Sequence, residues 1–323
     1  MKSSAPVEPL ALADGVRQAD ARAIARAISA IENREPGSQR LVQELFPATG
    51  HAVLVGLTGA PGTGKSSLAN TLAKEYRSQG KSVGVIAIDP TSPFTGGALL
   101  GDRIRMQQHA TDDGIYIRSM ATRGILGGLA GATADAAVVL DAAGKDIVLI
   151  ETVGVGQDEV DIVRLADVTV LLLVAGLGDD VQSFKAGVME IADVFVINKA
   201  DRGDTERLEQ ELKVVLGLKQ RADEWQPPIL KTVATEGTGV PELAAALDDY
   251  LAHIDRVGLA EQKRAERWQA RLVELIRQQA LERIRQAGVG RDQLERYAHQ
   301  IARRERDPYS VVEELLRTAG VAE

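Results

Sequence analysis

The chain has 323 residues, of which 45% are hydrophobic and 26% are charged, proportions that are ordinary for a globular protein. Its net charge of −8 argues against a nucleic-acid-binding protein, and the absence of cysteine excludes disulfides and thiolate metal sites. The first residues carry acids without a continuous apolar core, and no apolar run approaches the length of about 18 residues that a membrane span needs. We therefore expect a cytoplasmic protein that binds neither nucleic acid nor a membrane.

The first segment, residues 1–50, is expected to be helical. Apolar residues recur at helical spacing over residues 10–33, and a second short helix is predicted over residues 38–46. This amphipathic pattern is more typical of a cap packed on the next domain than of a separate functional unit. We therefore predict an N-terminal helical segment that covers part of its neighbour.

The second segment, residues 51–254, is predicted to be an α/β domain. Seven short runs rich in valine, isoleucine and leucine alternate with helical stretches: HAVLVGL, SVGVIAID, GIYIRSM, KDIVLIE, VTVLLLV, DVFVINK and PPILKTVA. These runs are apolar on both faces, which is typical of a mainly parallel sheet covered by helices on both sides. Ligands of such sheets bind at the carboxyl ends of the strands.

The third segment, residues 255–323, is predicted to contain one long helix and two shorter ones. The long helix carries a narrow apolar stripe flanked by dense charge, formed by Leu272, Leu275, Ile276, Ala280 and Ile284. Such a stripe favours a partner helix. We interpret the segment as a dimerisation arm, with a cap on the sheet as the alternative.

The clearest motif is GAPGTGKSS, which follows the first predicted strand and precedes a helix. It matches the phosphate-binding pattern G-x-x-x-x-G-K-[ST] of P-loop NTPases, whose glycines let backbone N–H groups point at phosphate oxygens. Its members are Gly59, Ala60, Pro61, Gly62, Thr63, Gly64, Lys65, Ser66 and Ser67. We expect Lys65 to reach the β- and γ-phosphates and Ser66 to bind Mg²⁺.

The tetrapeptide NKAD follows the sixth predicted strand and indicates guanine as the base. Asp201 can accept hydrogen bonds from guanine N1 and N2, Asn198 can support the loop and the base edge, and the stem of Lys199 can stack on the ring. The following stretch, TVATEGTG, provides a looser third contact, in which a backbone N–H at Val233 or Ala234 meets guanine O6. GTP and GDP are therefore the predicted ligands.

Three carboxylates at or beyond strand ends are candidates for catalysis and for binding Mg²⁺, which prefers oxygen ligands. Asp89 ends the second strand, Asp102 follows in the next loop, and Glu151 ends the strand KDIVLI. A helix N-cap is the alternative for Asp102. Behind Glu151, Gly154 gives the backbone freedom to approach the γ-phosphate. The sequence leaves open which carboxylate orients the attacking water.

The stretch AGLGDDVQSFKAG, residues 175–187, follows the fifth predicted strand. It places polar side chains, among them Gln182 and Lys185, at the catalytic edge of the sheet. One interpretation is a capped helix start; the other is a switch that reports the nucleotide state to a partner.

Together, GAPGTGKSS, AIDPTSPFTGGALLGDRIRM, ETVGVGQDEVD, AGLGDDVQSFKAG and NKAD resemble the MeaB/ArgK family of G proteins, which includes the methylmalonic aciduria type A protein. The resemblance implies a GTPase that gates cofactor loading and protects or reactivates an adenosylcobalamin-dependent acyl-CoA mutase. It also implies a homodimer formed through the C-terminal arm. By the same resemblance, Ser66, Asp89, Asp102 and Glu151 lie near Mg²⁺ and the attacking water.

Other functional classes fit less well. A metallochaperone GTPase needs clustered cysteine or histidine, and the chain has four histidines without close pairing. A P-loop kinase linked to amino-acid transport needs an acceptor pocket that no motif indicates. A targeting GTPase of the signal-recognition type needs a methionine-rich domain, and the chain has four methionines. The resemblance makes methylmalonyl-CoA mutase the first candidate partner, with isobutyryl- or 2-hydroxyisobutyryl-CoA mutases as alternatives.

Overall fold

A computed structural model describes residues 8–89, 112–121, 128–152, 165–176, 192–217 and 221–320. The chain divides into two compact units, with the boundary between Lys263 and Arg264. The first unit contains a parallel sheet and the helices that cover it, and the second is helical.

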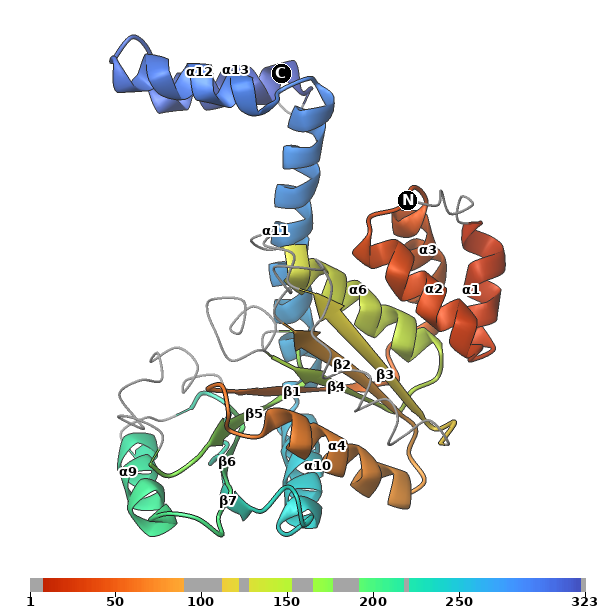
Figure 1. Cartoon of the computed structure of the whole chain (residues 1–323), viewed down its shortest axis with the longest axis vertical. Helices are drawn as coiled ribbons and strands as arrows, with labels where there is room; N and C mark the ends of the chain where they lie inside the picture. The colour runs from red at the N-terminus through yellow and green to blue at the C-terminus, as the bar shows by residue number, and fades with distance from the viewer. Residues whose placement is uncertain are drawn as a thin grey trace. The chain divides into compact units, whose positions relative to one another are not determined.

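The described residues of the first unit form a seven-stranded, wholly parallel sheet (Figure 1). Its strands are β1 (Val53–Gly59), β2 (Val83–Asp89), β3 (Ile115–Ala121), β4 (Ile147–Glu151), β5 (Val168–Leu173), β6 (Val194–Asn198) and β7 (Ile229–Thr232). Their spatial order is β3-β2-β4-β1-β5-β6-β7. All seven predicted strands are confirmed, and their carboxyl ends meet at one edge.

Alternate residues of the central strands enter different cores, which explains why the runs are apolar on both faces. In β5, Val170 and Leu172 face the core shared with α4 (Lys65–Ser78) and α10 (Val240–Arg256). Leu171 and Leu173 face the opposite core, shared with α9 (Thr205–Gly217). Helices thus cover both faces of the sheet.

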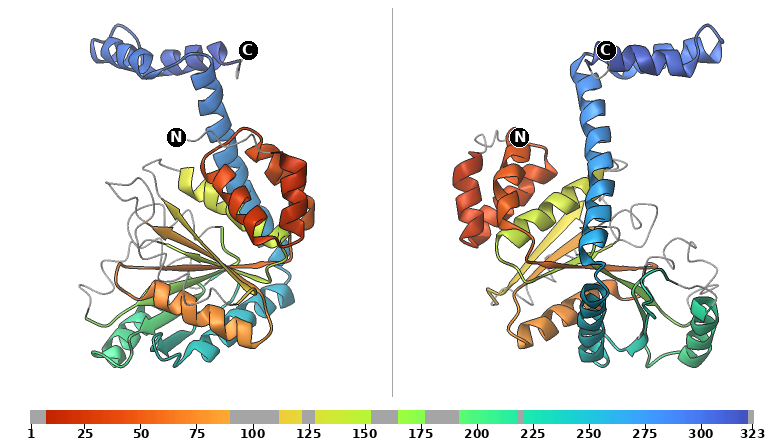
Figure 2. Two further views of the ribbon diagram at one scale, coloured as in Figure 1. Left: turned by 45° about the vertical axis from the view of Figure 1, so that its right-hand side comes forward. Right: turned by 180° about the vertical axis from the view of Figure 1, so that it is seen from behind.

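The N-terminal helices α1 (Pro9–Arg17), α2 (Ala21–Glu32) and α3 (Ser38–Leu45), together with the short 3-10 helix η1 (Phe46–Ala48), join the core beneath α6 (Gly128–Ala142). Figure 2 shows them beside α6, on the face of the sheet away from α4. The sequence pattern over residues 10–33 predicts a single helix, but the structure has two helices there, α1 and α2. Ala19 adopts a left-handed backbone with φ of 56°, and the Asp20 carboxylate caps α2 by accepting from the Ala23 N–H at 2.7 Å.

At the amino edge of the sheet, opposite the edge at which ligands are expected, aspartates accept hydrogen bonds from backbone N–H groups. Asp167 accepts from the backbone N–H of Leu54 at 2.9 Å, and Asp193 accepts from that of Thr169 at 2.9 Å. Asp146 accepts from the N–H of Ser82 at 2.6 Å, and this bond helps to lower the pKa of its carboxyl. These carboxylates satisfy backbone donors where the strands begin.

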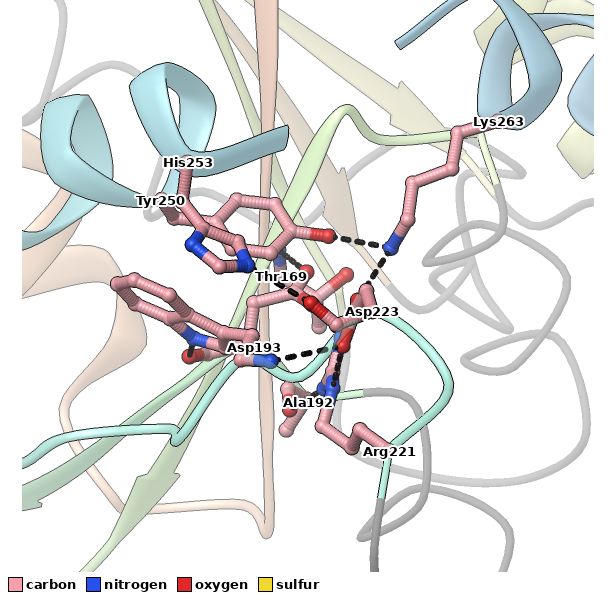
Figure 3. Close-up of polar contacts among 9 residues, drawn as sticks. Thr169, Ala192, Asp193, Arg221, Asp223, Tyr250, His253 and Lys263 are labelled. Carbon is pink, nitrogen blue, oxygen red and sulfur yellow. Dashed lines mark hydrogen bonds and ion pairs between the residues drawn. The ribbon is translucent and has the colours of Figure 1, made fainter. Parts of the chain in front are cut away.

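A network of ion pairs continues this edge beyond Asp193 (Figure 3). The Arg221 guanidinium lies 2.7 Å from Asp193 and 2.9 Å from Asp223. The Lys263 ammonium donates to Asp223 and to the Tyr250 hydroxyl, each at 2.8 Å. Burial alone would raise the pKa of Asp223, but hydrogen bonds from Arg221 and Lys263 outweigh it and hold the pKa well below its ordinary range.

The remaining helices are α11 (Ala260–Gln286), α12 (Arg291–Ala302) and α13 (Pro308–Thr318), which match the predicted long helix and two shorter ones. Val289, Val311 and Leu315 form a small buried core in the second unit. On α11, Leu272 and Ile276 remain more than half exposed. In the part of the chain that the structure describes, no helix is long and apolar enough to cross a membrane.

Replacing Arg221 by methionine is expected to lower the free energy of unfolding by about 3 kcal/mol, because the mostly buried Asp193 loses its ion-pair partner and Asp223 keeps only Lys263. Urea unfolding followed by circular dichroism measures the change. Arg207→Met is the matched control, since its pair with Glu211 is solvent-exposed and should contribute little. An Arg221→Met protein as stable as the Arg207→Met control would contradict a stabilising role for the network.

Candidate functional site

The phosphate loop lies between β1 and α4, at the carboxyl edge of the sheet. Gly59, Gly62 and Gly64 have positive φ angles of 146°, 81° and 95°, which residues with a Cβ rarely adopt. The turn is closed by Thr63, whose hydroxyl donates to the Ala60 carbonyl at 2.8 Å. This backbone leads directly into the N-terminus of α4, and a helix N-terminus favours an anion through its N–H groups and its dipole.

Lys65, the first residue of α4, adds a positive charge inside this loop. Its side chain is 6% exposed, and its ammonium donates to the carbonyls of Gly59 at 2.7 Å and Ala60 at 3.1 Å. The loop's own carbonyls thus hold the ammonium beside the helix N-terminus. The arrangement concentrates positive potential at one point of the sheet edge.

The loop after β6 is fixed against the phosphate loop. The Asn198 amide donates to the Thr63 carbonyl at 2.8 Å, and the Lys199 ammonium donates to the Gly62 carbonyl at 2.8 Å. Lys199 itself has φ of 56°, an uncommon conformation for a residue with a side chain. The NKAD segment and the GAPGTGKSS segment therefore form one connected site.

The other end of the Asn198 amide holds the loop after β7. Its oxygen accepts from the Thr232 hydroxyl at 2.9 Å and from the Ala234 N–H at 3.2 Å. The N–H of Val233 is used within the loop, where it donates to the Thr238 carbonyl at 3.0 Å. Sequence reasoning missed Thr232, because a threonine that ends a strand carries no signal of its own.

Asp201 lies at the exposed end of the same segment. Its carboxylate accepts from Arg202 at 3.2 Å, and its side chain is 41% exposed. A carboxylate in this position keeps accepting capacity toward solvent, as reading a purine edge requires.

Glu151 ends β4 beside the start of α4. It is 7% exposed, and its carboxylate accepts a hydrogen bond from the Ser66 hydroxyl. In the sheet it lies opposite Leu57 of β1 and Ala87 of β2, so the backbone of Asp89 ends the neighbouring strand just beyond it. A buried carboxylate and a hydroxyl are hard oxygen ligands, which fit Mg²⁺. Among the described residues, no group of three or more acidic or histidine side chains is placed to hold a metal ion by itself.

Four predicted site residues, Asp102, Gly154, Gln182 and Lys185, lie outside the described residues. The metal, γ-phosphate and switch contacts assigned to them stay predictions.

A parallel sheet with a glycine-rich loop before a helix, and an NKAD segment bonded to that loop, defines a P-loop GTPase. The family model described as "Methylmalonyl Co-A mutase-associated GTPase MeaB" matches residues 24–289. The chain belongs to the MeaB family.

Individual relatives agree with this assignment. A Pyrococcus abyssi protein whose name describes it as a GTPase is 48% identical over 309 residues, which cover 95% of each chain. The GTPase ArgK of Escherichia coli is 35% identical, covering 88% of this chain and 87% of its own. A crystal structure named as an LAO/AO transport system kinase superposes with a TM-score of 0.71 at 26% identity, covering 97% of this chain and 99% of that one.

Replacing Gly64 by alanine is expected to weaken guanine-nucleotide binding by roughly tenfold or more. The added Cβ would clash with the Asn198 amide nitrogen, and φ of 95° is strained for alanine. Titration with a fluorescent GDP measures the affinity. Gly80→Ala is the control, because Gly80 has a similar φ of 82° in open space at the far end of α4. Equal affinities in the two variants would show that Gly64→Ala has no effect specific to the site and would contradict the prediction.

Proposed function

We propose that this GTPase is a chaperone of an adenosylcobalamin-dependent acyl-CoA mutase, gating cofactor loading and protecting or reactivating the mutase. The observation that carries the proposal is the match of residues 24–289 to the family described as mutase-associated GTPases. A mouse relative named methylmalonic aciduria type A homolog, 37% identical over 236 residues and matched over 57% of its length, supports it. Methylmalonyl-CoA mutase is the first candidate partner, and isobutyryl- or 2-hydroxyisobutyryl-CoA mutases are the alternatives.

In this proposal the phosphate loop binds the phosphates of GTP or GDP, and the NKAD segment, which is hydrogen-bonded to that loop, binds the base with the loop after β7. The phosphate loop, Gly59–Ser67, holds the phosphates through its N–H groups and Lys65. The base is read by Asn198, Lys199, Asp201, Val233 and Ala234, and Gly154 approaches the γ-phosphate.

Ser66, Asp89, Asp102 and Glu151 would hold Mg²⁺, which when bound supplies charge neutralisation at the β- and γ-phosphate oxygens. The Ser66 hydroxyl donates a hydrogen bond to Glu151, so the lone pairs of the Ser66 oxygen can point toward a cation. Glu151 can accept a proton from water at the same edge, with Asp89 and Asp102 as the other candidates for this role. Gln182 and Lys185 would report the nucleotide state to the mutase.

The C-terminal arm would form a homodimer in the cytoplasm. We propose three functional parts, with boundaries at residues 1–50, 51–254 and 255–323. The support for the dimer is the row of exposed apolar side chains on α11, including Leu272 and Ile276.

Glu151→Gln keeps a hydrogen-bond acceptor for Ser66 but removes the carboxylate, so we expect single-turnover GTP hydrolysis to fall by about 10²-fold. Adding the apo-mutase should accelerate the unmodified protein and fail to rescue the variant. Radiolabelled GTP gives the rate and shows that phosphate reaches water rather than a protein or metabolite.

Glu206→Gln, on the exposed side of α9, is the control for the loss of one carboxylate. An unmodified protein equally fast with and without mutase would overturn the chaperone proposal. Undiminished hydrolysis by Glu151→Gln would overturn only the role of that residue.

Ile276→Lys should convert the dimer to a monomer, because a lysine cannot enter an apolar helix interface without losing solvation. Light scattering after size-exclusion chromatography measures the mass. Val214→Lys on α9 is the matched control, since Val214 is 66% exposed and Ile276 is 67% exposed. A monomeric unmodified protein, or a dimeric Ile276→Lys variant, would count against the arm interface.

A further inference from the structure

We infer that Thr71 on α4 is a positioning residue for guanine recognition, because it fixes the loop whose backbone N–H is expected to meet guanine O6. The inference rests on the proposed base-reading role of Asn198, Asp201 and Ala234. It adds a residue that lies outside the motifs GAPGTGKSS, NKAD and TVATEGTG.

The Thr71 hydroxyl lies between two carbonyl acceptors. One is Ser67, four residues earlier on α4, at 2.8 Å, and the other is Ala234, in the loop after β7, at 2.7 Å. A threonine inside a helix ordinarily donates to the carbonyl one turn back. Since a hydroxyl has one proton, the bond to Ala234 competes with that local bond.

The Ala234 residue is held from two sides. Its N–H donates to the Asn198 amide oxygen at 3.2 Å, and its carbonyl accepts from Thr71. The residue is 4% exposed, so its groups are shielded from bulk water, and the N–H would be shared between the Asn198 oxygen and guanine O6 when the base is bound.

The rest of the loop closes on itself. The Val233 N–H donates to the Thr238 carbonyl, and the N–H groups of Glu236 and Gly237 both donate to the Val233 carbonyl. The bonds made by Ala234 therefore carry the turn's attachment to the phosphate-binding side of the site.

The attachment matters because α4 begins with the phosphate-binding residues Lys65 and Ser66. One rigid helix thus holds the phosphate end of the site and, through Thr71, the loop at the base end. The Thr71 methyl lies beside Gly237, where an added Cβ would be 3.7 Å away. Valine at position 71 would keep this packing and remove only the hydroxyl.

The test compares Thr71→Val, Thr71→Ser and the unmodified protein for their affinity toward GDP and toward 2-aminopurine riboside diphosphate, which lacks both the O6 atom and the N1 proton of guanine. We expect Thr71→Val to weaken GDP binding by about fivefold to tenfold while binding of the analogue changes little. In hydrolysis the loss should appear in KM for GTP more than in kcat. Thr71→Ser should restore GDP affinity.

Thr318→Val is the matched control, since the Thr318 hydroxyl makes the ordinary helical bond, to the Glu314 carbonyl at 2.8 Å, on α13 of the second unit. If Thr71→Val does not fold, Thr71→Ala repeats the measurement. Equal losses for GDP and the analogue, or no loss at all, would overturn the inference. An unmodified protein that does not prefer GDP over the analogue would instead overturn the proposed base reading.

Discussion

The site depends on a single buried side chain, the amide of Asn198. A side-chain amide has donors on its nitrogen and acceptors on its oxygen, so it can hydrogen-bond to two backbone segments that are far apart in the sequence. Here the nitrogen holds the phosphate loop at Thr63, and the oxygen holds the loop after β7 at Thr232 and Ala234. At 2% exposure, an amide that lost either set of partners would be costly to bury. The parallel sheet brings these strand ends together, and the amide turns their proximity into a fixed geometry.

The two edges of the sheet are built from different chemistry. At the carboxyl edge, the chain uses positive φ angles at glycines and at Lys199, and aims backbone groups into the loop. At the amino edge, aspartates, Arg221 and Lys263 are satisfied by each other and by backbone donors. The strained backbone of the carboxyl edge thus lies where a ligand can satisfy the polar groups of the loop. The opposite edge contributes stability, because its charges already have partners.

Much of this arrangement could be predicted from the sequence, because its signals are local. Seven apolar runs gave seven strands, and GAPGTGKSS and NKAD each lie within a few residues of a strand end. What could not be predicted involves partners far apart along the chain. Thr71 looks like any helical threonine until Ala234 is placed beside it. Arg221 and Lys263 look like surface charges until the fold encloses Asp223 between them. The break at Ala19 was missed because the apolar spacing continues across it.

The aspartates at the amino edge also bear on how the strands find their alignment. In most half-buried strands, a shift by one residue exposes the apolar side chains, and this penalty sets the pairing. β4, β5 and β6 are buried on both faces, so such a shift would exchange one apolar face for another at little cost. Asp146, Asp167 and Asp193 each stand immediately before one of these strands and accept from a backbone N–H of the neighbouring strand or of the residue just before it. A slipped strand would pull a carboxylate away from its donor. For β4, β5 and β6, hydrogen bonds to these carboxylates favour the observed register, which burial on both faces leaves weakly specified.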